Sequence, residues 1–127
     1  MSGVDLVQWL NAQLDEDERI ARATRITSIT ARVYFNDTKA LSWDGDHESL
    51  STDGMFAPLA DHIAEHDPAR VLMEIDAKRW QVEMLANSIK PDPTTGIPRG
   101  VAWSMLTRMA EVYRDRPGWQ PYWPGSG

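Results

Sequence analysis

The residues best suited to chemistry are two histidines and a glutamate near the middle of the 127-residue chain. His62, Glu65 and His66 follow the H-x-x-E-H pattern of inverted zinc metallopeptidases. On a helix, residues four apart share a face, so both imidazoles could bind one metal ion, with Glu65 as the base. A third protein ligand would come from a downstream glutamate, namely Glu74, Glu83 or Glu111. One hypothesis is therefore a small metal-dependent hydrolase.

The residues after the motif favour another interpretation. Asp67-Pro68 follows His66 directly, which predicts that one helix ends there and another begins. His66 would then lie at a helix end, where a cation interacts favourably with the last carbonyl groups. The sequence also has no Gly-x-Ser-x-Gly elbow, Walker loop or dinucleotide fingerprint. We therefore expect no metal, no cofactor and no enzymatic activity, and we keep the hydrolase as the alternative.

Aromatic residues at the C-terminal end form the second candidate site. The chain has six tryptophans, several times the ordinary usage, and two of them lie in a proline-rich tail over 115–127. We name Trp119, Tyr122 and Trp123 as the candidate interaction residues, because exposed aromatic side chains are enriched at protein interfaces.

The tail could instead fold back onto the chain's own helices, and we favour this docked arrangement. The apolar residues expected to receive it are Leu6, Leu10 and Met109. The remaining tryptophans fall within predicted elements, where we expect them to be buried or half-buried; they are Trp9, Trp43, Trp80 and Trp103.

Composition limits the classes of function. The net charge of −6 argues against direct nucleic-acid binding, which depends on Lys and Arg at the phosphates. The absence of cysteine excludes disulfides, thiolate catalysis and cysteine-ligated zinc. No apolar run approaches the roughly 20 residues of a membrane span, and no signal peptide is evident, so we expect a cytoplasmic protein.

Hydrophobic periodicity predicts an α+β fold, a single small domain over 1–127 with about four helices packed around a β-hairpin. The hairpin is predicted over 26–44, where Ile29, Ala31, Val33 and Phe35 alternate with polar residues, which indicates one buried face. A short strand is expected near Leu50. Helices are predicted over 4–23, from Pro58 to His66, from the cap Asp67 to Asn87, and over 101–114; residues 88–100 form a Pro/Gly-rich loop.

Charge and apolar spacing add detail to these helices. Acid-before-base pairs four apart are Asp15–Arg19, Glu18–Arg22 and Glu74–Lys78. Arg70, Lys78 and Arg79 are interpreted as intrahelical pairing partners of neighbouring acids. The last helix has one apolar side, made by Val101, Met105, Met109 and Val112.

Three segments resemble a known family. Asp67-Pro68-Ala69-Arg70-Val71-Leu72, followed by Glu74 and Ala77-Lys78-Arg79, resembles the signature of an uncharacterised actinobacterial and actinophage family. The acidic stretch Leu14-Asp15-Glu16-Asp17-Glu18 is similar to that family's first helix, and the tail around Tyr113, Pro117, Trp119 and Trp123 to its aromatic C-terminus. The resemblance implies an actinobacterial or bacteriophage source and no assigned activity. We therefore expect an accessory protein that acts through protein–protein contact, on a partner or by self-association.

Overall fold

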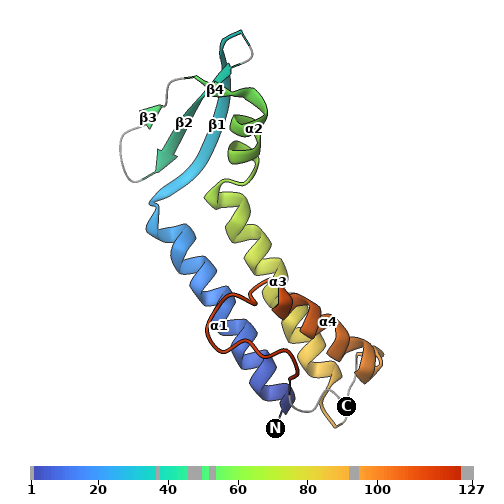
Figure 1. The fold of residues 1–127 in the computed structure, drawn as a ribbon. Helices are drawn as coiled ribbons and strands as arrows, with labels where there is room; N and C mark the ends of the chain where they lie inside the picture. Colours follow the sequence, from blue (N-terminus) through green and yellow to red (C-terminus); the bar gives the residue numbers. More distant parts are fainter. Residues whose placement is uncertain (1, 37, 46–49, 52–53, 92–94, 124–127) are drawn as a thin grey trace. The chain divides into compact units, whose positions relative to one another are not determined.

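The computed structural model describes residues 2–36, 38–45, 50–51, 54–91 and 95–123. Within these residues, four helices and an antiparallel sheet confirm the predicted α+β class (Figure 1). No described helix contains a stretch that is both long and apolar enough to cross a membrane. In chain order the elements are α1 (Ser2–Ala23), β1 (Ile26–Phe35), β2 (Thr38–Gly45), β3 (Leu50–Ser51), β4 (Met55–Phe56), α2 (Ala57–Glu65), α3 (Pro68–Ser88) and α4 (Arg99–Glu111).

The chain divides into two compact units. The first contains Met1–Glu16 and Asp76–Gly127, and the second contains Asp17–Ile75, so α1 and α3 contribute residues to both. The single domain over 1–127 stays a prediction.

The second unit is built on the predicted hairpin. β1 and β2 pair antiparallel, with Ala31 opposite Leu41, and both β3 and β4 pair with β2. Leu41 is buried, but Val33, near the turn, is 81% exposed. The predicted buried face is therefore wrong at Val33, which keeps the regular register opposite Lys39 but lies close to the turn end of the hairpin.

Helix α2 packs against β1 and β2 (Figure 1). Lys39 of β2 forms an ion pair with Asp61 of α2, with 2.7 Å between Nζ and Oδ1. The packed helix stabilises the hairpin, because two strands alone are marginally stable in water.

Asp67 connects α3 to the hairpin within this unit. One carboxylate oxygen accepts a hydrogen bond from the backbone N–H of Arg70 at 2.9 Å, which confirms Asp67 as the cap of α3. The other oxygen accepts one from the backbone N–H of Ile29 at 3.2 Å. Pro68, whose nitrogen has no hydrogen to satisfy, begins the helix as predicted.

The first unit has a helical core with contributions from α1, α3 and α4. The fully or nearly fully buried apolar residues that these helices contribute to the unit are Leu6, Leu10, Leu14, Val82, Leu85, Ala102, Trp103, Leu106 and Ala110. Arg79 of α3 pairs with Asp15 of α1, at 2.8 Å between Nη1 and Oδ1. The interpretation of Arg79 as an intrahelical partner was therefore wrong for this contact, which joins two helices.

Two sequence expectations about helix faces are also wrong. Helix α4 buries Ala102, Trp103, Leu106 and Ala110, whereas the predicted apolar side is largely exposed. Trp80, expected to be buried or half-buried, is 60% exposed. Both differences place apolar surface on the outside of the first unit.

Candidate functional site: an apolar groove on α3 and α4

The structure brings the two histidines of the H-x-x-E-H motif together at the end of α2. Their ring centroids lie 4.4 Å apart, with 35° between the ring planes. His66 is the C-cap residue, and its Nδ1 lies 2.9 Å from the carbonyl oxygen of His62. The predicted interaction of His66 with the carbonyl groups of the helix end is thus confirmed.

Glu65, the base of the hydrolase hypothesis, is engaged by an arginine. The Nη1 atom of Arg70 lies 2.5 Å from the Glu65 carboxylate and also donates to the Glu65 carbonyl oxygen at 3.2 Å. The Nε atom of Arg70 pairs with Glu74, one of the proposed third ligands, at 3.0 Å. Within the described residues, no three His, Cys, Asp or Glu side chains are arranged to hold a metal ion. The geometry therefore gives the hydrolase no support.

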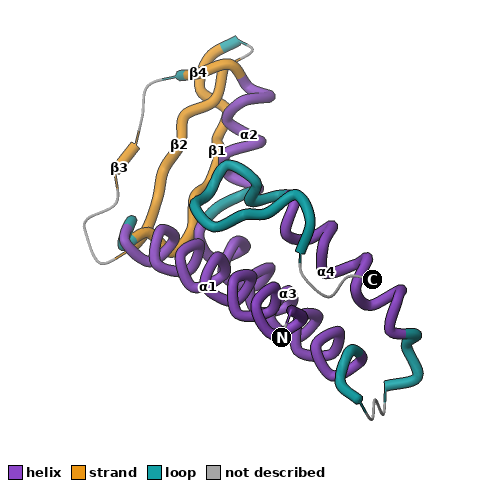
Figure 2. The backbone as a smooth tube through the Cα atoms, turned by 60° about the horizontal axis from the view of Figure 1, so that its bottom comes forward, coloured by secondary structure: helices purple, strands orange, loops and turns teal. Residues whose placement is uncertain are grey.

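The aromatic tail docks onto α1. Trp123 is 5% exposed, and its ring centroid lies 5.2 Å from that of Trp9. The indole Nε1 of Trp9 donates a hydrogen bond to the carbonyl oxygen of Pro117 at 2.9 Å, and the segment after α4 returns to α1 (Figure 2). The favoured docked tail is confirmed, with Trp9 as the ring that it meets. Tyr122 remains 86% exposed.

A second contact supports this docking. Arg116 donates from Nη1 to the carbonyl oxygen of Gln13 at 3.2 Å, and its guanidinium lies 4.7 Å from the ring centroid of Tyr113. A cation placed over an aromatic face is attracted by the ring's electron density. Of the three candidate interaction residues, Trp123 therefore has an internal role, Trp119 is half-buried, and Tyr122 is exposed.

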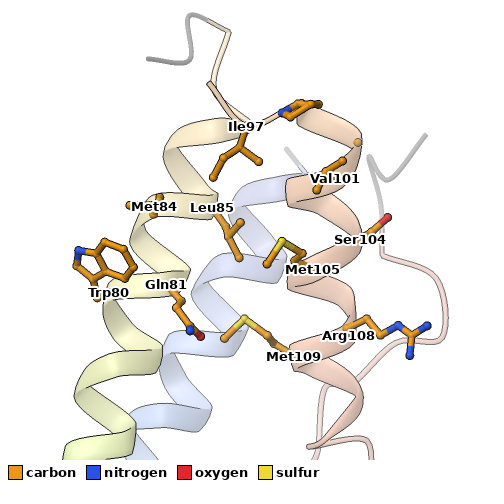
Figure 3. A pocket seen from close by; sticks show the side chains of 12 residues that line it. Trp80, Gln81, Met84, Leu85, Ile97, Val101, Ser104, Met105, Arg108 and Met109 are labelled. Atoms are coloured by element: carbon orange, nitrogen blue, oxygen red, sulfur yellow. The ribbon is translucent and has the colours of Figure 1, made fainter. Parts of the chain in front are cut away.

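A groove of about 950 Å³ lies on α3 and α4 in the described part of the chain (Figure 3). We call it the α3–α4 groove. Met105 and Met109 project from α4 toward the α3 side, where Leu85 and Trp80 lie, and Ile97 stands at one end (Figure 3). Its lining residues are Trp80, Gln81, Met84, Leu85, Ile97, Pro98, Gly100, Val101, Ser104, Met105, Arg108 and Met109.

The sequence of α4 explains why this surface exists. The helix is apolar on two sides, and only the side that carries Trp103 and Leu106 enters the core. Val101 and Met105, on the other side, are each 49% exposed. A surface helix ordinarily shows one apolar stripe, so a second apolar stripe marks a contact surface.

The lining of the groove is mostly apolar, with a single charge. Among the twelve described residues that line the groove, Arg108 is the only charged one. General acid–base chemistry needs titratable groups placed against the substrate, and an apolar wall with one guanidinium does not supply a matched acid and base. Methionine side chains adapt their shape and are enriched at binding surfaces that accept varied partners.

The groove was not predicted from the sequence, although one signal for it was present. Trp80 precedes Val82 by two positions, which on a helix rotates it by roughly 200° from the buried face. Val82 is 1% exposed, so a residue on the opposite side of α3 faces outward. Helical geometry alone could thus have identified Trp80 as a surface tryptophan.

The fold and the groove together define a small α+β protein with an exposed apolar groove. The chain belongs to DUF6221, a family of unknown function, whose model matches residues 3–124. No curated protein matched the chain. No solved structure matched it either. The expected membership of an uncharacterised family is confirmed at this level.

Proposed function

We propose that this protein is a non-enzymatic interaction protein, and that its α3–α4 groove binds an amphipathic helix of another polypeptide chain. One observation carries the proposal: α4 fills the core with one apolar side and leaves a second apolar side, with Met105 and Val101, open to solvent. Contiguous exposed apolar surface of this kind marks sites of protein contact. A groove bounded by two helices suits a third helix that lays its apolar face between them.

The chemistry of the groove specifies what the bound helix must present. Apolar side chains at spacings of three and four residues would fill the surface around Leu85, Met105 and Met109. A carboxylate beside that apolar stripe would meet Arg108, because a guanidinium binds a carboxylate through a planar pair of donors. The partner is therefore an acidic amphipathic helix.

The proposal also includes the source of the protein and the compartment in which it acts. The resemblance of the segment from Asp67 to Arg79 supports an actinobacterial source or a phage that infects actinobacteria. The cysteine-free composition fits a reducing cytoplasm, that of the host where a phage encodes the chain. There the protein would be an accessory factor rather than a catalyst.

Peptide selection tests the groove directly. A library of random peptides is selected against the purified full chain, and the binding of the enriched peptides is measured by fluorescence anisotropy. We expect enriched peptides with apolar residues at helical spacing and with acidic residues. Met105→Asp should weaken their binding by about tenfold or more, because it places a carboxylate in the apolar wall.

Tyr122→Ser is the matched control for this experiment. It removes an exposed aromatic side chain outside the groove, on the tail that sequence analysis named as an interaction site. Peptide affinity should be unchanged in this variant. Enriched peptides that bind Met105→Asp as tightly as the wild type, or that lose affinity only with Tyr122→Ser, would refute the groove as the binding site.

A further inference from the structure

The α3 wall of the groove is itself an acidic amphipathic helix surface. Trp80 and Met84 are four residues apart, and Ala77 precedes Trp80 by three, so the three side chains lie along one side of α3. Trp80 is 60% exposed. Asp76 and Glu83, four residues before and three residues after Trp80, flank it on the same side, and both are exposed. This surface presents the chemistry that the groove requires of its partner.

We propose that the occupant of the α3–α4 groove is a second copy of this chain. In this arrangement the Trp80 side of α3 in each copy enters the groove of the other. The proposal rests on the proposed binding function of the groove and identifies its partner. Trp80 would be both a wall of one site and the anchor that fills the other.

Charge supports the choice of a second copy. Arg108 is the single cation of the groove lining, and the tryptophan that would enter carries two carboxylates beside it, Asp76 and Glu83. Opposite charges on the rim of an apolar contact fix its register and exclude wrong partners. The apolar centre and the charged rim are thus complementary between two copies of one surface.

In a symmetric dimer, each copy would insert its Trp80 surface into the groove of the other. Homodimers most often have a twofold axis, so that residue i of one copy contacts residue j of the other and the reverse also holds. A surface that carries both the protruding tryptophan and the recess satisfies this condition without any second binding site. Two equivalent contacts then form at once, and the assembly closes as a dimer instead of extending into a filament.

Sedimentation velocity of the full chain tests self-association. At a protein concentration of about 100 µM and an ionic strength of about 0.15 M, where charges beyond about 8 Å are screened, we expect a dimer. Trp80→Ala should weaken the dimer by at least about tenfold, since aromatic anchors dominate contact energies. Circular dichroism should show an unchanged fold, because the Trp80 side chain is largely outside the core. Tyr122→Ser, the control aromatic substitution, should leave the dimer intact.

A charge-swap experiment tests the reciprocal geometry. In its homodimer, the Arg108→Glu variant places an acid opposite the acids Asp76 and Glu83. The double variant Asp76→Lys with Glu83→Lys places two cations opposite Arg108. Each variant alone should therefore dissociate more readily than the wild type. In a mixture of the two variants, both contacts pair opposite charges. The expected result is a heterodimer that forms more tightly than either variant homodimer.

The outcomes separate this inference from the proposed function. A chain that stays monomeric, or a dimer that survives Trp80→Ala, overturns the second copy as the occupant. A mixture of charge variants that gains no heterodimer overturns it as well. Selected peptides that still lose affinity with Met105→Asp would leave the binding function of the groove standing, and peptides insensitive to that substitution would refute it independently.

Discussion

Asp67 joins two elements of the second unit with one side chain, so its removal is the most informative test of the fold. One carboxylate oxygen accepts the Arg70 N–H at 2.9 Å and the other accepts the Ile29 N–H at 3.2 Å. The substitution Asp67→Ala removes both acceptors without adding bulk. It leaves the first turn of α3 and the start of β1 each with an N–H group that has lost its partner.

The expected loss follows from these two bonds. Replacing an N-cap aspartate by alanine costs about 1 kcal/mol, within a range of about 0.5–2. The bond to Ile29 is longer and only part-buried, so we assign it about 1 kcal/mol, near the average for protein hydrogen bonds. The free energy of unfolding should therefore fall by about 2 kcal/mol, which is a large share of the roughly 5–15 kcal/mol of an ordinary domain.

Thermal melting and amide hydrogen exchange measure this effect at two levels. For a chain of this size, a loss of about 2 kcal/mol lowers the melting temperature by several degrees. Where local opening governs exchange, each amide loses a bond of about 1 kcal/mol, so the amides of Ile29 and Arg70 should each exchange about fivefold faster. Asp67→Asn is the matched variant: it retains one acceptor oxygen for the cap and places an amide donor near Ile29, so it should lose about half as much stability.

Three outcomes would contradict these roles of Asp67. An Asp67→Ala variant with an unchanged melting temperature and unchanged exchange at Arg70 would show that Asp67 does not cap α3. Faster exchange at Arg70 but not at Ile29 would show that the bond to the hairpin contributes nothing. Equal losses of stability in the alanine and asparagine variants would contradict the division of the stabilisation between two hydrogen bonds.

Two further predictions concern the tail and the histidine pair. Gly118 has φ of 91°, and a Cβ there would lie 2.6 Å from Nε1 of Trp9, so Gly118→Ala should displace the tail, cost about 1–3 kcal/mol and shift tryptophan fluorescence to the red. An unchanged spectrum and melting temperature would contradict this docking. His62→Ala combined with His66→Ala should preserve the circular dichroism spectrum, and metal analysis of the wild type should find no stoichiometric zinc. About one tightly bound zinc per chain, lost in the double variant, would restore the hydrolase hypothesis.

Local chemistry allowed much of the fold to be predicted. The capping aspartate with Pro68 marked the start of α3, and the structure places that helix at Pro68–Ser88 against a predicted end at Asn87. Alternating apolar residues predicted the hairpin, which spans Ile26–Gly45 as β1 and β2. These signals act through hydrogen bonds and spacings within a few residues, so the sequence contains them directly.

The exposed groove could not be predicted from periodicity, because it depends on contacts between distant segments. Helix α4 has two apolar sides, and the pattern of Met105 and Val101 was as good a core candidate as that of Trp103 and Leu106. Only tertiary packing decides which side is buried.

The tail and α3 thus place tryptophan in opposite environments, one buried and one exposed, and this contrast bears on function. Trp123, which lies outside any helix, is buried against Trp9, whereas Trp80, inside the longest predicted element, is exposed. Burying an indole yields roughly 1.5–3 kcal/mol, so the docked tail has a sufficient explanation in stability alone. An exposed indole beside an apolar groove has no such explanation, because it adds nothing to the core and promotes association. The surface that stability does not explain is therefore where an interaction should be sought, on α3 and α4 rather than on the aromatic tail.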